Sequence, residues 1–425
     1  MVSLLAIAKV AVLAMTHPVK KTRFLLPILL LFTFFSYPAD SQQPVASFYY
    51  DDRGNVVRQE HDANGDGKMD RWTYYNAQGQ IERIEQDVNF DGEPDLFAYY
   101  QAGKLMRQEI ASKSDGQIDT WLFFDARGEI ERKGQDPNHS GKPTIWLYYQ
   151  NGQPVRSEED TKLAGTMNRT VTFRDGKISR VDEDSNGDGK PDSFSYYENG
   201  QLARKELDRK FIGKIDLRGY YQEGKLVKQE EDIHGNGRMG RVVYFQGDDV
   251  VRREEDGAGY GRMDIIETFS KGRIVKRIRD TKGNGKWDAV YYFKDNELVR
   301  EERDTDGNGV FDLRLIYEKG QVLRQEADTN GDRMVDVWVN FQNGERVEQL
   351  EDQEFRGKIT ARYIFKSGQV TGQEPVAHGE PPIAAAPFGL VDEELRNLAS
   401  FTPSTADASR VLTGQAGLSS GGEIK

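Results

Sequence analysis

A unit of 24 or 25 residues recurs along most of this chain, and it constrains the fold more than any other feature. Its best copy, residues 184–207, reads DSNGDGKPDSFSYYENGQLARKEL, and a new copy begins at Asp208. The first residues of the successive copies are Asp62, Asp87, Ala111, Asp136, Asp160, Asp184, Asp208, Asp232, Asp256, Asp280, Asp304, Asp328 and Asp352. A fixed period of this length indicates a stacked array, because one such unit cannot bury a core alone.

The last fifteen residues of each unit have the pattern of a β-hairpin. In the best copy, 193–197 is a short aromatic strand, Asn199 and Gly200 suit the positive φ angles of a type I′ turn, and 202–207 is the return strand. The sequence therefore predicts an all-β fold, an elongated antiparallel array of about 14 hairpins in a solenoid-like meander. We expect this repeat domain over residues 42–374, with an incomplete first copy ending at Tyr50.

Particular residue types recur at fixed places in the hairpins. The first strand ends on an aromatic residue in every copy, at Tyr75, Tyr100, Phe124, Tyr149, Phe173, Tyr197, Tyr221, Phe245, Phe269, Phe293, Tyr317, Phe341 and Phe365. An aliphatic residue such as Leu202 usually opens the return strand and is expected to pair with that aromatic residue. Strict alternation then places Arg204 and Glu206 on the same face, where the arginine can stack on the aromatic ring.

The opposite face is predicted to carry a second set of aromatic residues. Its members include Trp72, Phe97, Trp121, Trp146 and Trp338, with Tyr74, Tyr99, Phe123, Tyr148 and Tyr196. One interpretation is a surface for a glycan or an extended partner chain. The other is that one face forms the buried seam of a twisted or coiled sheet, because a sheet with aromatic residues on both faces must cover one of them.

The hairpins resemble the MORN-like repeats of bacterial YwqK-type antitoxin proteins. The likeness lies in 72–75 (WTYY), 148–153 (YYQNGQ) and 196–202 (YYENGQL), and it covers only the hairpin part of each unit. This resemblance implies a long antiparallel β array used for binding. An acidic loop replaces the glycine-rich connector of those repeats, so the antitoxin function does not transfer.

The first nine residues of the unit follow the pattern D-x-[ND]-x-[DN]-G-x-x-D. Carboxylate and amide oxygens at alternate positions, with a glycine at the sixth, are typical of loops that coordinate Ca²⁺ through oxygen ligands. These connectors resemble the calcium loops of thrombospondin type 3 and FG-GAP repeats and the first half of an EF-hand. Five loops supply the predicted ligands, namely Asp62, Asn64, Asp66 and Asp70; Asp87, Asn89, Asp91 and Asp95; Asp184, Asn186, Asp188 and Asp192; Asp304, Asp306, Asn308 and Asp312; and Asp328, Asn330, Asp332 and Asp336.

The alternative interpretation is a polar turn that needs no metal, because Asn-Gly and Asp-Gly form turns unaided. Several loops have lost ligands and carry a lysine at the third position, at Lys113, Lys162 and Lys210. We hypothesise that this ammonium replaces the cation by reaching neighbouring carboxylates. The Asp328 loop departs from the pattern in another way, with Arg333 where glycine is expected.

Both ends of the chain lie outside the repeats. Lys20, Lys21 and Arg23 precede an apolar run over 24–35, which predicts a secretory signal peptide over residues 1–41, cut after Ser41 and with its start at Met15 as one option. An uncleaved membrane anchor is the alternative. Residues 375–425 read as a low-complexity tail with a short amphipathic helix at 390–399, either docked or fraying alone.

Composition and motifs limit the function. The net charge is -12 and the chain has no cysteine, which argues against nucleic-acid binding and excludes disulfides. The five histidines are dispersed and no catalytic motif is present, so no enzymatic activity is expected. We expect an exported calcium-binding repeat protein, periplasmic, surface-bound or secreted, that binds a protein or glycan on a sheet face and spans no membrane after signal cleavage. The alternative is a passive spacer made rigid by weakly bound calcium.

Overall fold

The computed structural model describes residues 45–113, 115–379 and 386–399. Within these ranges the chain forms 28 strands and one helix. The strands are β1 (Ala46–Tyr50), β2 (Val56–His61), β3 (Arg71–Tyr75), β4 (Ile81–Gln86), β5 (Leu96–Gln101), β6 (Lys104–Ile110), β7 (Thr120–Phe124), β8 (Ile130–Gln135), β9 (Ile145–Gln150), β10 (Gln153–Glu159), β11 (Arg169–Arg174), β12 (Lys177–Glu183), β13 (Ser193–Glu198), β14 (Gln201–Leu207), β15 (Leu217–Gln222), β16 (Lys225–Glu231), β17 (Arg241–Gln246), β18 (Asp249–Glu255), β19 (Ile265–Ser270), β20 (Arg273–Arg279), β21 (Ala289–Lys294), β22 (Glu297–Arg303), β23 (Leu313–Glu318), β24 (Gln321–Ala327), β25 (Val337–Gln342), β26 (Glu345–Glu351), β27 (Ile359–Lys366) and β28 (Gln369–Gly379), and the helix is α2 (Val391–Ala399).

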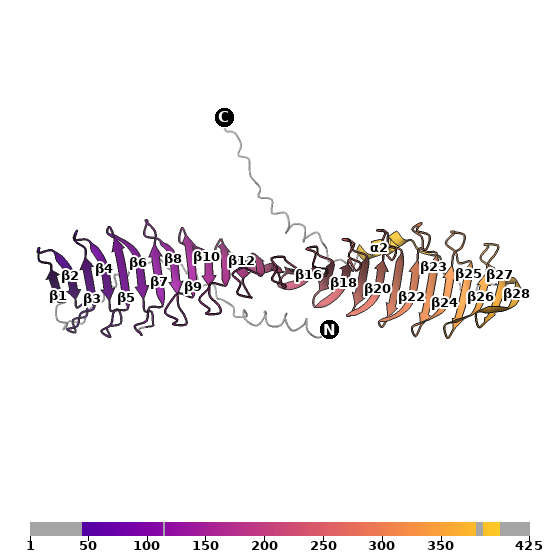
Figure 1. The fold of residues 1–425 in the computed structure, drawn as a ribbon, viewed down its shortest axis with the longest axis horizontal. Helices are drawn as coiled ribbons and strands as arrows, with labels where there is room; N and C mark the ends of the chain where they lie inside the picture. The colour runs from indigo at the N-terminus through magenta and orange to yellow at the C-terminus, as the bar shows by residue number, and fades with distance from the viewer. Residues whose placement is uncertain (1–44, 114, 380–385, 400–425) are drawn as a thin grey trace, which may run out of the picture.

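All 28 strands belong to one sheet, in which each strand pairs antiparallel with the next along the chain. Two kinds of connection alternate, a tight turn within each hairpin and an acidic loop between hairpins. Figure 1 shows the sheet face-on at its two ends and nearly edge-on around β16, because the strand twist accumulates along the array. The predicted all-β meander of about 14 hairpins is confirmed.

The hairpin turns have the geometry that the Asn-Gly pairs predict. Asn199 and Gly200 have φ angles of 51° and 82°, and the flanking Glu198 and Gln201 pair directly across the turn. Positive φ at both central residues defines the type I′ turn, which Asn-Gly accommodates at low steric cost. The turn therefore fixes the register of this hairpin. The turns after β1, β3 and β7 are one residue longer.

A β-bulge beside each turn changes the face on which the arginines lie. Tyr197 pairs with Leu202 as predicted, but Tyr196 pairs with Arg204, so Ala203 is an extra residue in the return strand. The predicted grouping of Arg204 with Tyr197 is wrong, because strict alternation does not hold across a bulge. We call the face that carries the Arg204, Glu206 and Tyr196 side chains and their counterparts the ladder face.

The ladder face repeats one arrangement of three side chains. Where the residue that precedes the last aromatic residue of the first strand is also aromatic, the basic side chain of the return strand stacks on its ring. The ring distances include 4.4 Å for Arg58 on Tyr49, 4.2 Å for Arg83 on Tyr74, 4.1 Å for Arg107 on Tyr99 and 4.2 Å for Arg204 on Tyr196. The hydroxyl of Tyr196 donates to Glu206 at 3.1 Å, within reach of the same arginine. Each stacked pair contributes about 0.5–1 kcal/mol at such half-exposed sites, so the repetition mainly stabilises the register.

Most of the sheet is a single layer. Trp72, Phe97, Trp121 and Trp146 lie on the ladder face and are half-buried, whereas Trp338 is only 3% exposed. Within the described residues, another segment of the chain covers the ladder face only near the C-terminal end. There a segment that we call the strap, residues 386–399, covers the ladder face (Figure 1).

The strap builds the main apolar core. Phe388 and Phe311 are fully buried, and they pack with the partly aliphatic ladder face of the last hairpins. The cluster comprises Ile266, Ile278, Val290, Phe311, Val335, Trp338, Leu350, Ile359, Phe388 and Val391. On α2, Glu394 pairs with Lys276 and accepts a 2.8 Å hydrogen bond from the Tyr292 hydroxyl. Of the two options left open by the sequence, the helix is therefore docked.

The ends of the repeat domain differ slightly from the expected boundaries. β28 continues to Gly379, beyond the boundary expected at residue 374. The signal peptide predicted over 1–41 lies outside the described residues, as do 380–385 and 400–425 of the tail. None of the described helical residues forms a helix long and apolar enough to cross a membrane.

Candidate metal loops

The thirteen acidic loops lie in a single row, each linking the return strand of one hairpin to the first strand of the next. The first residue of every loop is buried, including Ala111 in the one loop without an initial aspartate. Its main-chain N–H donates to the carbonyl of the ninth residue of the preceding loop, as Asp208 does to Asp192 at 2.8 Å. The sheet ladder thus continues through the loops and fixes their spacing.

Within a complete loop, each predicted ligand already accepts main-chain hydrogen bonds. The carboxylate of Asp184 accepts from Gly187 at 2.6 Å and from Gly189 at 2.7 Å. Asp192 accepts from Ser185 at 2.8 Å. The sixth residue needs a positive φ, 84° at Gly189, which explains the recurrent glycine. These bonds define the shape of the loop and carry no information on whether an ion occupies it.

The predicted ligands divide into an inner and an outer set. Asp62, Asp70, Asp87, Asp95, Asp184, Asp192, Asp304, Asp328 and Asp336 are buried, and Asn64 and Asp312 are half-buried. Asp66, Asn89, Asp91, Asn186, Asp188, Asp306, Asn308, Asn330 and Asp332 are exposed. Among the residues described, three carboxylates come within 4.8 Å of one another at a single place, where Asp304, Asp306 and Asp312 meet.

The ninth residue shows how a complete loop differs electrostatically from a degenerate one. Burial raises the pKa of Asp70 above its ordinary value, and the nearby carboxylates of Asp62 and Asp66 raise it further against two main-chain hydrogen bonds. Burial also raises the pKa of Asp119, but the Ser112 and Thr120 hydroxyls and the Lys113 ammonium outweigh it, and the net shift is downward. Neighbouring carboxylates therefore raise the pKa of the ninth residue in the Asp62 loop, whereas a lysine lowers it in the Ala111 loop.

Lysines at the third loop position make contacts different from those hypothesised. Lys162 donates to the carbonyl of Ser185 at 2.6 Å, and Lys282 donates to that of Thr305 at 3.1 Å. His234 makes the equivalent contact to the Asp256 carbonyl at 2.6 Å. The hydrogen bonds described for these side chains thus run to the main chain of the next loop, and they link one loop to its neighbour.

Sequence reasoning missed the eighth loop position, which is apolar in every copy. Its members are Met69, Pro94, Ile118, Pro143, Met167, Pro191, Ile215, Met239, Met263, Trp287, Phe311, Val335 and Ile359. Phe311, Val335 and Ile359 are buried in the cluster that the strap completes. Aligning the copies at the eighth position would have revealed this apolar row, although not the segment that covers part of it.

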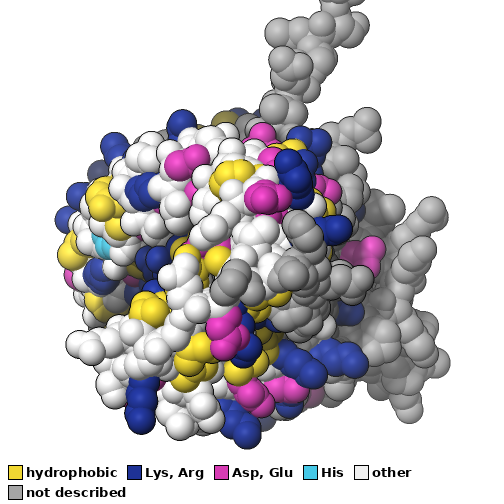
Figure 2. All heavy atoms as spheres, turned by 90° about the vertical axis from the view of Figure 1, so that its right-hand side faces the viewer, with side chains coloured by type: hydrophobic (Ala, Val, Ile, Leu, Met, Phe, Trp, Pro, Cys, Tyr) yellow, Lys and Arg dark blue, Asp and Glu magenta, His cyan; other side chains and the backbone are white. Residues whose placement is uncertain are grey.

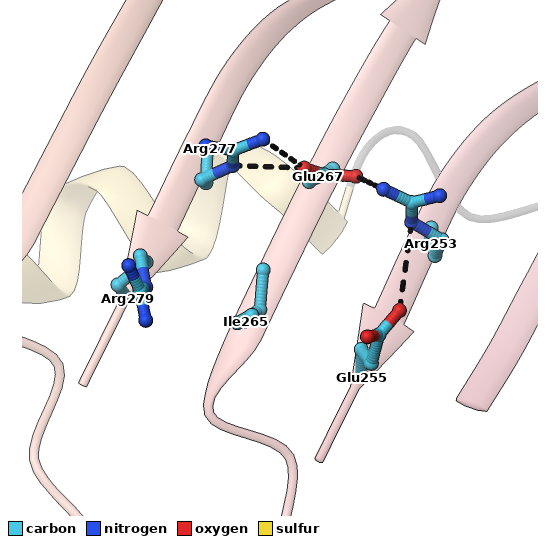
Figure 3. Close-up of a pocket in the computed structure, with 6 residues that line it drawn as sticks. All are labelled: Arg253, Glu255, Ile265, Glu267, Arg277 and Arg279. Atoms are coloured by element: carbon cyan, nitrogen blue, oxygen red, sulfur yellow. Dashed lines mark hydrogen bonds and ion pairs between the residues drawn. The ribbon is translucent and has the colours of Figure 1, made fainter. Parts of the chain in front are cut away.

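A hollow of about 230 Å³ lies on the face opposite the ladder face, across β18, β19 and β20. Figure 3 shows Glu267 between Arg253 and Arg277, with Arg277 Nε 2.8 Å from its carboxylate. Glu267 is 2% exposed, so two guanidinium groups neutralise a buried charge. The paired side chains give this hollow a structural role in holding three strands together.

Comparisons with known proteins do not place the chain in a family. No family profile and no curated protein matches it. Solved structures that match in part include accessory secretory protein 1,2 and 3 of Streptococcus pneumoniae (15% identity, 33% of this chain and 19% of that chain, TM-score 0.09) and TcdB2-TccC3 without its hypervariable C-terminal region (12%, 76% and 23%, 0.16). A porin-like protein from Bacteroides uniformis gives 11% identity over 71% of this chain and 90% of that chain, with a TM-score of 0.09.

The chain thus spans about a fifth of the length of the first two of these structures. TM-scores this low do not establish a shared fold or a shared function. The hairpin-repeat architecture consequently rests on the chain's own geometry.

Proposed function

We propose that this protein is an exported calcium-binding repeat protein that acts as an extended binding or adhesion module at the cell envelope or outside the cell. The observation that carries the calcium part is geometric: the carboxylates of Asp304, Asp306 and Asp312 lie within 4.8 Å of one another. In a second loop, the carboxylates of Asp62 and Asp66 raise the pKa of Asp70. A divalent cation bound in a complete loop would offset this repulsion between carboxylates.

The Asp304 loop is the best candidate among the five, because Asp304, Asp306 and Asp312 converge there. Extracellular sites of this kind bind calcium with dissociation constants of about 10⁻⁴–10⁻³ M. At tenfold saturation one such site adds about 1.4 kcal/mol to the free energy of unfolding. Several sites in series would then stiffen the row of loops, as in thrombospondin type 3 and FG-GAP repeats.

The uncovered part of the ladder face supports the binding role. Trp72, Phe97, Trp121 and Trp146 recur there once per hairpin and remain half-buried without a second layer above them. Successive members lie two strands apart, about 10 Å. A flat row of aromatic rings flanked by stacked arginines suits an extended chain or a glycan, in keeping with the binding arrays that MORN-like repeats form.

Calcium titration tests the proposal. We expect Ca²⁺ to raise the melting temperature and EDTA to lower it, with heat released on titration. Asp66→Ala should remove one equivalent of binding, because Asp66 is the fifth residue of a complete loop. Asp115→Ala is the matched control at the fifth position of the Ala111 loop and should change nothing. An unchanged melting temperature together with no heat of binding would contradict the proposed calcium binding.

A glycan array on the calcium-loaded protein separates binding module from passive spacer. Specific glycan binding that is lost in the Trp121→Ala variant supports a binding module. Absence of binding to both glycans and extended peptides favours a passive spacer. Mass spectrometry of the protein recovered from its natural host tests export, with an N-terminus at Gln42 as the expected result.

A further inference from the structure

Within the described part of the chain, β1 pairs with a strand on one side only, whereas the first strand of every later hairpin is paired on both sides. β3 pairs with β2 on one side and with β4 on the other, and the same holds for each later first strand. β1 pairs with β2, and its second edge has no strand partner among the residues described. The N–H and C=O groups along that edge are therefore available for hydrogen bonds.

Because no described return strand precedes β1, its aromatic side chains are more exposed than those of the later hairpins. Phe48 is 50% exposed, Tyr49 43% and Tyr50 61%. Their counterparts in the next copy, Tyr74 and Tyr75, are half-buried. A neighbouring strand on this edge would cover aromatic surface on both faces of the sheet.

The β1 edge also lacks the features that keep a free edge unpaired. Residues 45–50 read VASFYY, with no charge and no proline. Edge strands that stay single usually carry lysine, proline or a strong twist, since these oppose pairing with another chain. β1 instead keeps the residues of an interior first strand.

The opposite end of the sheet is blocked. Gly372 occupies the position at which twelve other return strands carry arginine or lysine, and Pro375, which has no N–H, lies at a ladder position of β28. Proline cannot donate to an incoming strand and is confined to edges for that reason. On the end that Figure 2 shows, basic and acidic side chains also lie among the apolar ones.

Little of the chain precedes β1 in the exported form, so this argument rests on the proposed export. Cleavage after Ser41 leaves only residues 42–44 before Val45. A covering strand needs about five residues and a turn, and three residues supply neither. A second copy of the chain is then the occupant that the edge can accept.

We propose that two copies pair through their β1 strands, antiparallel and about a two-fold axis near Phe48. The axis stands perpendicular to the sheet, so the two ladder faces lie on the same side and the loop rows on opposite long edges. Such a contact is isologous and closes at two chains, because the β28 edge is blocked. The result is one continuous sheet of twice the length.

The expected length follows from strand spacing. Twenty-eight strands at about 4.8 Å span on the order of 130 Å, and end-to-end pairing doubles this to about 260 Å. A dimer formed through the sheet faces would keep the shorter length. Solution scattering combined with light scattering therefore distinguishes the two kinds of dimer by length at equal mass.

The test uses the calcium-loaded chain purified from its natural host. The proposal predicts the mass of two chains and a doubled maximum dimension. Phe48→Lys should halve both, Ala46→Pro should do the same by removing a donor from the open edge, and Val370→Lys on the β28 edge should leave the dimer intact. Equal melting temperatures for these variants show that the array still folds.

Each other outcome overturns the proposal. A monomer at every concentration, a dimer of unchanged length, or a mass that keeps rising with concentration would each contradict β1 pairing closed at two chains. The N-terminus determined on the same sample separates this from the proposed function. A monomer that begins at Gln42 would contradict the β1 pairing but not the proposed export. A protein that retains residues 1–41 would contradict the proposed export.

Discussion

The main-chain N–H of Phe388 donates to the carbonyl of Arg333 at 2.9 Å, and the guanidinium of Arg333 donates back to the carbonyl of Phe388 through Nε at 2.9 Å and Nη2 at 2.8 Å. Arg333 replaces the loop glycine and keeps its positive φ, 76°. A left-handed conformation costs a residue with a Cβ about 1–2 kcal/mol. The reciprocal contact offsets that cost and explains why this one loop departs from the glycine pattern.

Arg333→Gly should release the strap without weakening the sheet. The variant removes the two guanidinium hydrogen bonds to Phe388, which destabilises the strap. It also removes the backbone strain at residue 333, which stabilises the array. We expect faster amide exchange across residues 386–399 and a melting temperature of the array that does not fall. Arg333→Lys, which keeps the charge but not the planar fork, should exchange at an intermediate rate. Unchanged exchange in Arg333→Gly would contradict the role of this contact.

Phe388→Ala should detach the strap more completely. Phe388 is fully buried, and truncating such a side chain costs about 3–5 kcal/mol. The loss falls on the strap because the strands keep their own ladder. Trp338 fluorescence should shift to longer wavelength as this ring becomes hydrated. Phe355→Ala removes a ring that is 50% exposed and should leave the spectrum unchanged.

Glu267→Gln should weaken the sheet between β18 and β20. The substitution leaves Arg253 and Arg277 without their shared carboxylate (Figure 3). Losing hydrogen bonds to a charged group costs about 1.5–3 kcal/mol, towards the lower end here because both arginines are partly hydrated. Chemical unfolding measures this cost, and Glu297→Gln at an exposed turn serves as the control. Equal midpoints for the two variants would refute the assignment.

Acid should destabilise the array through its loop aspartates. Burial raises the pKa of Asp232, but N–H donors of Gly237, Asn236 and Gly235 outweigh burial, and the net pKa lies below the ordinary value of 3.8. A carboxyl group with a lowered pKa in the folded state stabilises the fold above its unfolded pKa and loses that contribution as the pH falls through the folded value. Metal-free protein should therefore melt at lower temperature at pH 3 than at pH 6.

Asp232→Asn provides the matched comparison for this pH effect. An amide cannot titrate, so the variant should lose stability at pH 6 and show a smaller change between the two pH values. A wild-type melting temperature that is equal or higher in acid would contradict the sign of the effect.

Local patterns predicted the hairpins but not the faces of the strands. Asn199 and Gly200 identified the turn because both residue types adopt positive φ at low steric cost, which is a local preference. The bulge at Ala203 depends on how two strands meet beside that turn, so strict alternation put Arg204 on the wrong face. The candidate loop ligands were likewise predicted from spacing, whereas the convergence of Asp304, Asp306 and Asp312 appears only in three dimensions.

The repeat period, the type I′ turns and the hydrogen-bonded shape of the loops were determined by the sequence itself, because each depends on residues within one 24-residue unit. The placement of the strap was decided only by tertiary structure. Phe388 meets Phe311 and Arg333 across more than fifty residues of chain, and no local propensity encodes such a contact. Burial of apolar surface selects it, because the ladder face is aliphatic there: Ile278 stands where other return strands carry glutamate, beside Ile266 and Val290.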